Sequence, residues 1–482
     1  MSRSYAGGLA EEAPEDHILE RPPVALGSCA APEWRSLTGW GNGSSQRCLV
    51  WEPRDARQCA AAVLSHETAS LIARGLGRSY GDPAVNAGQG VLQATRLRRM
   101  LAFDPTSGRL TCEAGVSLAE IIEVFLPRGW FLPVTPGTKF VTLGGAIAAD
   151  VHGKNHHRDG SIGNFIDEIS LLGADGEVRV CSREDSAELF WATLGGMGLT
   201  GVILRATIRL RKVDSAYVEV AYRRARDLDE ALALFEAGDR HFRYSVAWID
   251  CLAGGGKLGR SVVMQANEAA PDAVVRRFGG DPLLPPRRPR KSIPWNFPSG
   301  VLNSWTVAAF NKLYYAAHKD AVRLVDYDRF FYPLDAVSHW NRIYGKRGFV
   351  QYQILLPRQT SRAGLVSILE RLVRSRRASF LAVLKSSGAA TPSPLSYLFP
   401  GHTLALDLPN TGEDLVSLLN ELDETLVALG GRVYLAKDSV ARKDAFAAMY
   451  PRLGEFLELK SRIDPECRFS SSQARRLGFA PA

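Results

Sequence analysis

The chain has 482 residues, 46% hydrophobic and 23% charged, which is the composition of a folded globular protein rather than a disordered one. This length corresponds to roughly three domains of about 150 residues, or to fewer and larger ones. The net charge of +8 favours an anionic partner such as a phosphate, a nucleic acid or a membrane surface, without choosing among them.

The N-terminal segment is acidic and rich in proline and lacks an apolar core, so a signal peptide is not expected and residues 1–31 are interpreted as a loosely ordered leader. No apolar run approaches the roughly 18–20 residues that span a bilayer. The seven cysteines are scattered and form no C-x-x-C pair, which favours reduced core thiols in the cytoplasm over zinc or a redox dithiol.

Residues 32–212 read as short strands and helices in alternation. Asp55 is predicted to cap a helix over "ARQCAAAVLSHE", and "LIARG" then reads as a strand. "RLTCEAG" predicts another strand, and Ser117 with Glu120 forms a capping box before the helix "LAEIIEVFL". Further on, "FWATLGGMGLTGVILRATIRL" predicts a helix that passes through glycines into a β-branched strand.

The stretch "ARGLGRSYGD" (73–82) is the first candidate for chemistry. Gly75, Gly77 and Gly81 follow a predicted strand, where backbone N–H groups converge on an anion and missing side chains permit close contact. The stretch lacks the G-K-[ST] ending of a Walker loop and does not fit G-x-G-x-x-G cleanly, so a purely structural turn is the alternative.

A second glycine turn, Gly144–Gly145, lies in "PVTPGTKFVTLGGAIAADVHGKNHHRDGSIGN" and precedes a dense polar cluster. His152, His156 and His157 invite a metal hypothesis, but two of them are adjacent and no H-E-x-x-H is present, so we expect no metal. Two turns suited to phosphate indicate one long cofactor held at several points, and a dinucleotide is the natural candidate.

From Tyr217 the pattern changes to strand alternation in "YVEVAYR", "YSVAWID", "FVQYQILLP", "FLAVLKS" and "HTLALDLP", separated by helices. The half-exposed character of several strands predicts a largely antiparallel sheet covered on one side, in an α+β second domain. In the helix "EDLVSLLNELDETLVALG", the predicted buried face is given by five leucines: Leu415, Leu418, Leu422, Leu426 and Leu429.

The Pro-rich, basic segment 270–300 is predicted to be a mobile loop. A solvated linker is the plainer interpretation. The alternative is that its cations, with Trp295 and Phe297, lie near an anionic lipid surface.

These motifs, together with "ELFWATLGGMGLTGVILRATI", "WNRIYG", "AMYPR" and "YLAKDS", resemble the FAD-binding vanillyl-alcohol oxidase superfamily. More narrowly, they resemble the decaprenylphosphoryl-β-D-ribose 2-oxidase family of bacterial arabinan-precursor synthesis, from residue 37 to residue 477. The resemblance implies an α+β, two-domain PCMH-type fold. Residues 32–212 would bind FAD, residues 213–431 would form a substrate domain on an antiparallel sheet, and residues 432–482 would return to the first domain.

The resemblance also implies which residues hold the cofactor. Other superfamily members tether flavin through a histidine in the first glycine turn, where this chain has Arg78, so we expect FAD to be bound non-covalently. The residues implied for FAD are Ala73, Arg74, Gly75, Leu76, Gly77, Arg78, Ser79, Tyr80, Gly81, Asp82, Pro83, Gly137, Thr142, Leu143, Gly144, Gly145, Ala149, Asp150, Val151, His152, Ile203 and Tyr434.

For the chemistry, the family implies oxidation of the ribose C2 hydroxyl to a ketone with hydride transfer to the flavin. Lys437 would stabilise the negative charge of the reduced flavin, although a surface lysine is the interpretation without the resemblance. His152 would accept a proton or orient the sugar. The substrate pocket would be walled by Tyr80, Lys154, Trp248, Gln353, Lys385 and Lys437.

Two departures from the family leave lipid and sugar specificity open. Ala405 stands where mycobacterial members have a cysteine beside the flavin, and Phe331–Tyr332 stand where they have Tyr-His.

The resemblance implies a polyprenyl-phosphoryl sugar substrate and a nicotinamide-dependent keto-reductase partner that completes epimerisation to the arabinose lipid. We expect a cytoplasmic protein with a peripheral contact at the inner membrane, and no nucleic acid partner. One alternative is a sugar-alcohol or aldonolactone oxidase acting on a soluble substrate. The other is a non-catalytic lipid-phosphate or nucleic-acid binding protein.

Overall fold

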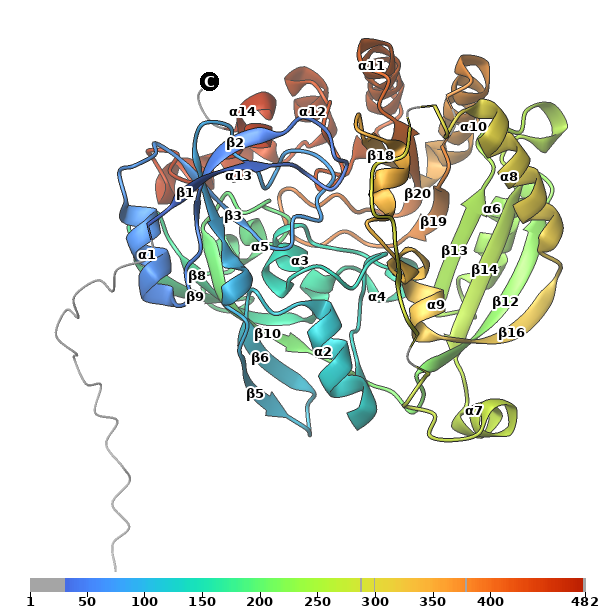
Figure 1. The fold of residues 1–482 in the computed structure, drawn as a ribbon, viewed down its shortest axis with the longest axis horizontal. Coiled ribbons are helices and arrows are strands. Elements are labelled where there is room, and N and C mark those ends of the chain that lie inside the picture. The colour runs from blue at the N-terminus through green and yellow to red at the C-terminus, as the bar shows by residue number, and fades with distance from the viewer. Residues whose placement is uncertain (1–30, 287, 299, 378, 480–482) are drawn as a thin grey trace, which may run out of the picture.

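The computed structural model describes residues 31–286, 288–298, 300–377 and 379–479, so the predicted leader, apart from Ala31, lies outside the described residues. The first part of the chain contains a four-stranded sheet of order β1-β2-β4-β3 (Figure 1). Strands β1 and β2 are antiparallel, and the other neighbours are parallel. The strands are β1 (Glu33–Leu37), β2 (Gln46–Trp51), β3 (Leu71–Arg74) and β4 (Gly90–Gln93).

A five-stranded antiparallel sheet of order β5-β6-β10-β8-β9 completes this half. Its strands are β5 (Met100–Asp104), β6 (Arg109–Glu113), β8 (Ile166–Leu172), β9 (Val178–Ser182) and β10 (Val202–Arg209), and β7 (Trp130–Phe131) pairs separately with β11 (Arg211–Lys212). The helices are α1 (Ala56–Leu64), α2 (Leu118–Phe125), α3 (Leu143–Ala148), α4 (His156–Asp159) and α5 (Ala187–Thr193).

The helix starts follow from local sequence. The Asp55 carboxylate accepts a hydrogen bond from the Gln58 amide at the start of α1. Ser117 and Glu120 form the predicted capping box at the start of α2. Both caps satisfy amides that have no partner within the helix, and both predictions are confirmed.

An eight-stranded antiparallel sheet of order β16-β12-β14-β13-β19-β20-β18-β21 forms the second half, which confirms the predicted α+β class. Its strands are β12 (Tyr217–Ala225), β13 (Tyr244–Ile249), β14 (Ser261–Glu268), β16 (Ala321–Asp326), β18 (Phe349–Pro357), β19 (Ala382–Ser387), β20 (Gly401–Pro409) and β21 (Arg432–Val433). The later helices are α6 (Leu228–Gly238), α7 (Pro271–Phe278), α8 (Ser304–Ala317), α9 (Tyr327–Phe331), α10 (Arg358–Ser375), α11 (Glu413–Ala428), α12 (Lys443–Met449), α13 (Leu453–Ile463) and α14 (Ser472–Leu477).

The two faces of this sheet have different partners, because successive side chains of a strand point to opposite faces. Tyr352 of β18 donates a hydrogen bond to Asp423 of α11 on one face. Its neighbours Gln351 and Gln353 point to the other face, where they line a cavity. Strands β13 and β18 are therefore buried along almost their whole length, and not half-exposed as predicted.

Both ends of the described chain connect the two halves. The Gly41 amide donates to the carbonyl of Tyr80, and the Gly41 carbonyl accepts from the Phe349 amide. After β21 the chain returns to the first half, where the Leu71 amide donates to the Arg468 carbonyl. Figure 1 shows these last helices, drawn in red, beside the blue N-terminal strands.

Two details of the prediction are wrong. Leu419, and not Leu418, is fully buried on α11, because the contact face follows positions 415, 419, 422 and 426. The segment 270–300 is not simply a loop, since α7 begins at Pro271 and residues 291–292 form β15 (Lys291–Ser292), which pairs with β17 (Val337–Ser338). Within the described residues, no helix combines the length and the hydropathy that crossing a bilayer requires.

Candidate active site

The first predicted glycine turn follows β3 and has no space for side chains. A Cβ on Gly75 would lie 2.2 Å from the Thr142 hydroxyl, and one on Gly81 would lie 1.9 Å from the carbonyl oxygen of Asp438. Gly77 has a φ of +64°, which glycine adopts without strain. Among the described residues none accepts a hydrogen bond from the amides of residues 76–79, so these donors are available to a ligand.

Gly144 and Gly145, predicted to form a second turn, lie instead in the first turn of helix α3, directly against the first glycine turn. The Thr142 hydroxyl accepts a hydrogen bond from the Gly145 amide and begins α3, and the same hydroxyl fills the space beside Gly75. A Cβ on Gly144 would lie 2.8 Å from that of Ala114. The two turns, far apart in sequence, thus line one cavity of about 620 Å³.

Most of the residues predicted to hold the cofactor or the substrate line this cavity, which both halves of the chain enclose. They are Ala73, Arg74, Gly75, Leu76, Gly77, Arg78, Ser79, Tyr80, Pro83, Gly137, Thr142, Gly144, Gly145, Ala149, Val151, His152, Ile203 and Tyr434, with Lys154, Trp248, Gln353, Lys385 and Lys437.

Four predicted residues do not line the cavity. Gly81 packs against backbone, and Leu143 is fully buried in the hydrophobic core. The Asp82 carboxylate forms an ion pair with Arg476 at 2.7 Å. Asp150 is buried and accepts a hydrogen bond from a backbone amide of a neighbouring turn. These four residues support the backbone of the cavity wall without facing the cavity. The side chains of Leu143, Asp82 and Asp150 contact other parts of the protein instead.

The floor of the cavity is a row of residues across the second sheet. Pairing registers place Trp248 opposite Val383, Val383 opposite Ala405, and Ala405 opposite Gln353 on four successive strands. Lys385 lies two residues beyond Val383 on the same face, as the period of a strand requires.

His152 lies at the end of this row. Its Nε2 accepts a hydrogen bond of 2.8 Å from the Gln353 amide, which places the ring proton on Nδ1. Burial lowers the pKa of His152 well below its usual value, and the nearby positive charge of Lys385 lowers it further. His152 is therefore neutral, with Nδ1 as a hydrogen-bond donor that has no partner among the described residues.

The three clustered histidines have different hydrogen-bond partners, although the rings of His152 and His156 meet edge to face with centroids 6.2 Å apart. Nδ1 of His156 accepts a hydrogen bond from the Gly388 amide, whereas Nε2 of His157 donates to the carbonyl of Phe242. His152 bonds to Gln353 of the second sheet, so each of the three rings has its own hydrogen-bond partner.

The lysines concentrate positive charge in the cavity. Nζ of Lys154 donates to the carbonyl oxygen of Phe330 and lies 4.3 Å from the centroid of the same residue's ring. Burial lowers the pKa of Lys154 to about 7 and that of Lys385 to about 8. An anionic group bound between them would raise both values, because it favours the charged forms.

Lys437 lies beside Tyr80, with Nζ 3.8 Å from the centroid of the phenol ring. Burial lowers the pKa of Lys437, while the carboxylate of Asp407 acts to raise it. Asp407 is fully buried, accepts a hydrogen bond from Gln351, and has its own pKa raised by burial.

Sequence reasoning missed several residues of this site. Asp407 and Gln351 lie two positions along from Ala405 and Gln353, so strand alternation would have placed them on the same face. It also missed an apolar end of the cavity, for which no motif exists. The residues of that end are Met264, Phe310, Tyr314, Phe330, Phe331, Pro333, Leu334, Trp340, Phe380 and Leu381.

Both departures from the family lie at or next to the cavity wall. Ala405 lines it, and none of the cysteines in the described part of the chain does. Phe331 also lines it, whereas the hydroxyl of Tyr332 bonds to that of Thr135.

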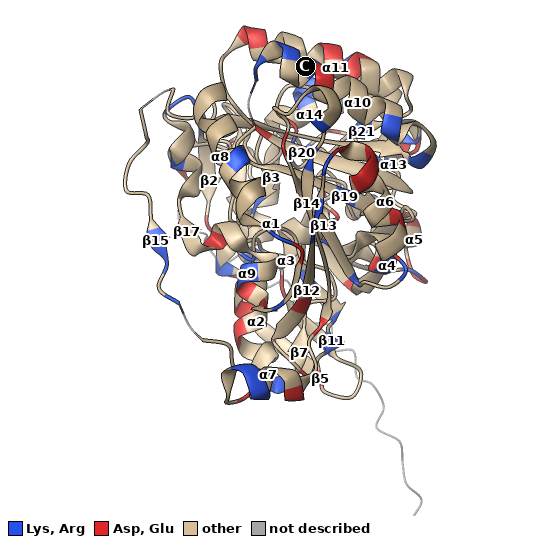
Figure 2. Ribbon diagram, turned by 90° about the vertical axis from the view of Figure 1, so that its right-hand side faces the viewer, with Lys and Arg blue, Asp and Glu red and all other residues tan. Residues whose placement is uncertain are grey.

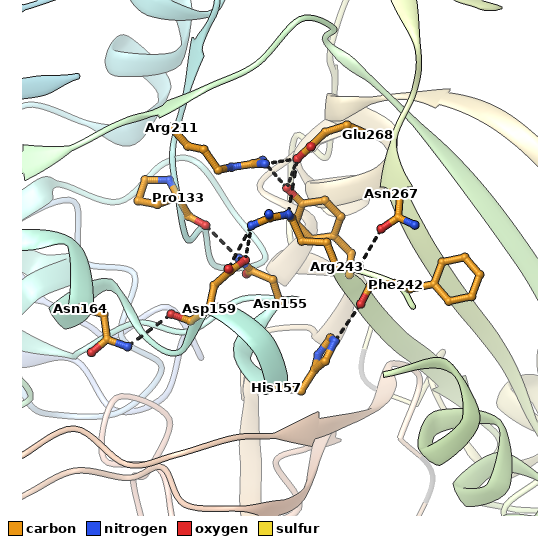
Figure 3. A network of polar contacts seen from close by, with 11 residues as sticks. Pro133, Asn155, His157, Asp159, Asn164, Arg211, Phe242, Arg243, Asn267 and Glu268 are labelled. Carbon is orange, nitrogen blue, oxygen red and sulfur yellow. Dashed lines mark hydrogen bonds and ion pairs between the residues drawn. The ribbon is translucent and has the colours of Figure 1, made fainter. Parts of the chain in front are cut away.

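A polar network holds the histidine-bearing segment against the second sheet (Figure 3). Nη1 of Arg243 lies 2.9 Å from both carboxylate oxygens of Asp159 in α4. Asn155 donates to the carbonyl of Pro133 at 2.8 Å and also to Asp159. The network fixes the backbone that carries Lys154 toward the cavity.

The residues present fit FAD. The unpaired amides of 76–79 and the close-packed glycines form a cradle that added Cβ atoms would obstruct. Nε of Arg78 is buried without a partner in the described residues, and the guanidinium lies 3.9 Å from the ring centroid of Trp40. A pyrophosphate group would satisfy these donors, and the residues of the two turns would hold it.

Comparison with known proteins agrees with this geometry. Residues 49–182 match an FAD binding domain model, which covers both glycine turns. The fold and the site together define an FAD-dependent oxidoreductase.

Over 451 residues the chain is 38% identical to the decaprenylphosphoryl-beta-D-ribose oxidase of Mycolicibacterium smegmatis, covering 92% of this chain and 97% of that protein. It therefore belongs to the decaprenylphosphoryl-β-D-ribose oxidase family. It is also 37% identical, over 76% of its length, to the whole of an uncharacterized protein of Streptomyces coelicolor. A D-arabinono-1,4-lactone oxidase of Yarrowia lipolytica is 25% identical over 38% of this chain and 36% of that protein.

Proposed function

We propose that the protein oxidises the C2 hydroxyl of a polyprenyl-phosphoryl-β-D-ribose to the 2-keto sugar. The observation that carries this proposal is one cavity lined by three kinds of residue. They are the glycine turns, the lysines Lys154, Lys385 and Lys437, and a set of apolar and aromatic side chains. A cofactor, a phosphorylated sugar and a prenyl chain need these three environments together.

The lysines and the aromatic end suit the two ends of such a substrate. Lys154 and Lys385 would bind the phosphate, because an anion compensates the cost of keeping ammonium groups away from water. Trp248 and Phe310 would contact the first prenyl units through apolar surface.

At the reacting carbon, bound FAD supplies the hydride acceptor. Lys437 would hold a positive charge beside Tyr80, and Asp407 keeps that charge in place by favouring the protonated amine. His152, neutral and protonated on Nδ1, is arranged to donate a hydrogen bond to a sugar oxygen. This arrangement favours orienting the sugar over accepting its proton.

A 2-keto sugar lipid calls for a reductase as the next enzyme. The partner in this proposal is a nicotinamide-dependent keto-reductase that completes the epimerisation to the arabinose lipid. The substrate is a membrane lipid, so the enzyme would work in the cytoplasm at the inner membrane. The net charge of +8 supports contact with an anionic membrane surface.

An absorbance spectrum of the purified flavoprotein tests the proposal. Anaerobic addition of prenyl-phosphoryl ribose is expected to bleach the flavin band, because electrons enter the cofactor and cannot leave to oxygen. Soluble polyols and aldonolactones at the same concentration serve as controls. Bleaching by these and not by the lipid would replace the proposal with a soluble sugar oxidase.

A further inference from the structure

Helix α8 carries apolar side chains on two opposite sides. Phe310 and Tyr314, one turn apart, face inward and line the apolar end of the cavity. Trp305 and Leu313 lie on the outer side, with 81% and 71% of their surface exposed. A helix that is apolar on both sides is normally covered on both sides, by protein or by lipid.

The outer side of α8 is a continuous stripe. Between Trp305 and Leu313 it presents the small residues Ala308 and Ala309, and Ala316 extends it by a turn. Val301, half-exposed just before the helix, extends it at the other end. Isolated exposed apolar residues are ordinary on a protein surface, but a helix-length stripe with an exposed tryptophan marks a contact surface.

The positive charge near the stripe favours an anionic partner. Residues 301–325, which include the stripe, contain three basic residues, Lys312, Lys319 and Arg323, and a single acidic residue, Asp320. Lys312 lies within the stripe itself, and Lys319 and Arg323 are exposed just beyond its end. Helix α8 carries no acidic residue, as Figure 2 shows by its lack of red. A second copy of this surface would be repelled by the same charge, whereas an anionic bilayer would attract it.

We propose that the outer side of α8, centred on Trp305 and Leu313, docks on an anionic lipid bilayer. This inference rests on the proposed function and deepens it, because the helix would separate the bilayer from the apolar end of the cavity by one helix width. Tryptophan at the headgroup level and lysine at its edge are the side chains that suit such an interface. A lipid substrate would then pass from bilayer to cavity along α8 without exposing its prenyl chain to water.

Sedimentation with vesicles tests the surface directly. The FAD-loaded full chain is mixed with vesicles of phosphatidylcholine alone or with added phosphatidylglycerol. Binding to the anionic vesicles is expected, and the double variant Trp305→Ser/Leu313→Ser is expected to weaken it at least tenfold. Trp34→Ser is the matched control, because Trp34 lies on β1 with 48% of its surface exposed and should leave binding unchanged.

A charge variant separates lipid from protein partners. Lys312→Glu/Lys319→Glu should abolish the salt-sensitive part of vesicle binding and leave the flavin spectrum intact. Failure of the wild-type protein to sediment, or an equal loss in the Trp34→Ser control, would overturn the proposal. A dimer in light scattering that the serine variant converts to a monomer would assign the stripe to a second copy instead.

Flavin bleaching distinguishes this inference from the proposed function. With detergent-dispersed prenyl-phosphoryl ribose, the Trp305→Ser/Leu313→Ser variant should bleach as fast as the wild type, since neither residue lines the cavity. With substrate embedded in vesicles it should be at least tenfold slower, and equal rates would contradict the docking role. If vesicle binding holds but no lipid sugar bleaches the flavin, the substrate assignment fails and the docking surface stands.

Discussion

At the scale of single residues, Lys437 in the cavity wall interacts electrostatically with Asp407, a buried carboxylate that does not line the cavity. Lys437 could be singled out only through the family resemblance, because one lysine in a loop has no pattern of its own. Asp407 and Gln351 escaped notice because a polar residue in an apolar strand does not reveal its partner. Their roles depend on which strands are neighbours, and that is a tertiary fact.

The pair makes a prediction for pH dependence. With Lys437 acting as a cation, flavin reduction should fall as pH rises through its folded pKa. Asp407→Asn removes the charge that raises this pKa, so the fall should move to lower pH, by about one unit or more. Rapid-mixing measurements of flavin reduction across pH 5.5–9 would show the shift.

Asp423→Asn is the matched control for this experiment. Asp423 is equally buried and also has a raised pKa, of about 7, but it bonds to Tyr352 on the opposite face of the sheet. Its substitution should leave the midpoint in place. A rate that instead rises with pH, with a midpoint lowered in Asp407→Asn, would identify Lys437 as a base in its neutral form.

At the scale of elements, local rules succeeded where the decisive interaction is local. The caps at Asp55 and Ser117 and the first glycine turn are short-range features, and each lies where its residues predicted. The pair Gly144–Gly145 does not, because it lies within helix α3 and not in a turn. Strand β18 was different, because its second face is buried by a cavity wall that belongs to the other half of the chain. The alternation of polar and apolar residues along a strand indicates the chemistry of each face of the sheet. It does not indicate whether other parts of the protein cover that face.

Helix α11 gives the element-scale prediction. Leu419→Ala should destabilise the protein by about 2–5 kcal/mol, because Leu419 is fully buried, whereas Leu418→Ala should cost clearly less. Urea midpoints of the two FAD-loaded variants, followed by tryptophan fluorescence, would give this order. Equal midpoints would restore the face first predicted from the sequence.

At the scale of the whole molecule, the cavity lies at the interface between the two halves of the chain. The glycine turns that line it come from the first half, and Lys385 and Lys437 come from later segments. A hydrogen-bonded ion pair between Arg243 and Asp159 also connects the two halves. Occupancy of the cavity should therefore stabilise both halves together.

Removal of FAD tests this interface. The cofactor should leave without a covalent trace when the protein is denatured, because Arg78 packs on Trp40 where related enzymes carry a tethering histidine. The apoprotein should melt several degrees lower, since a ligand at 100 times its Kd adds about 2.7 kcal/mol. Titration with FAD should restore Tm in a concentration-dependent way, and FMN, which lacks the adenylate, should restore less. An unchanged Tm without FAD would contradict binding of the flavin in the cavity between the two halves.

The returning C-terminal segment has a consequence for biosynthesis. Leu71 in the first half bonds to Arg468, so the nucleotide-binding half lacks a neighbour until nearly all of the polypeptide has left the ribosome. At about 5–20 residues per second, residues 213–468 take on the order of ten to fifty seconds to translate. During that interval the nascent first half exposes an unfinished edge, and chaperone capture is expected there before cofactor loading begins.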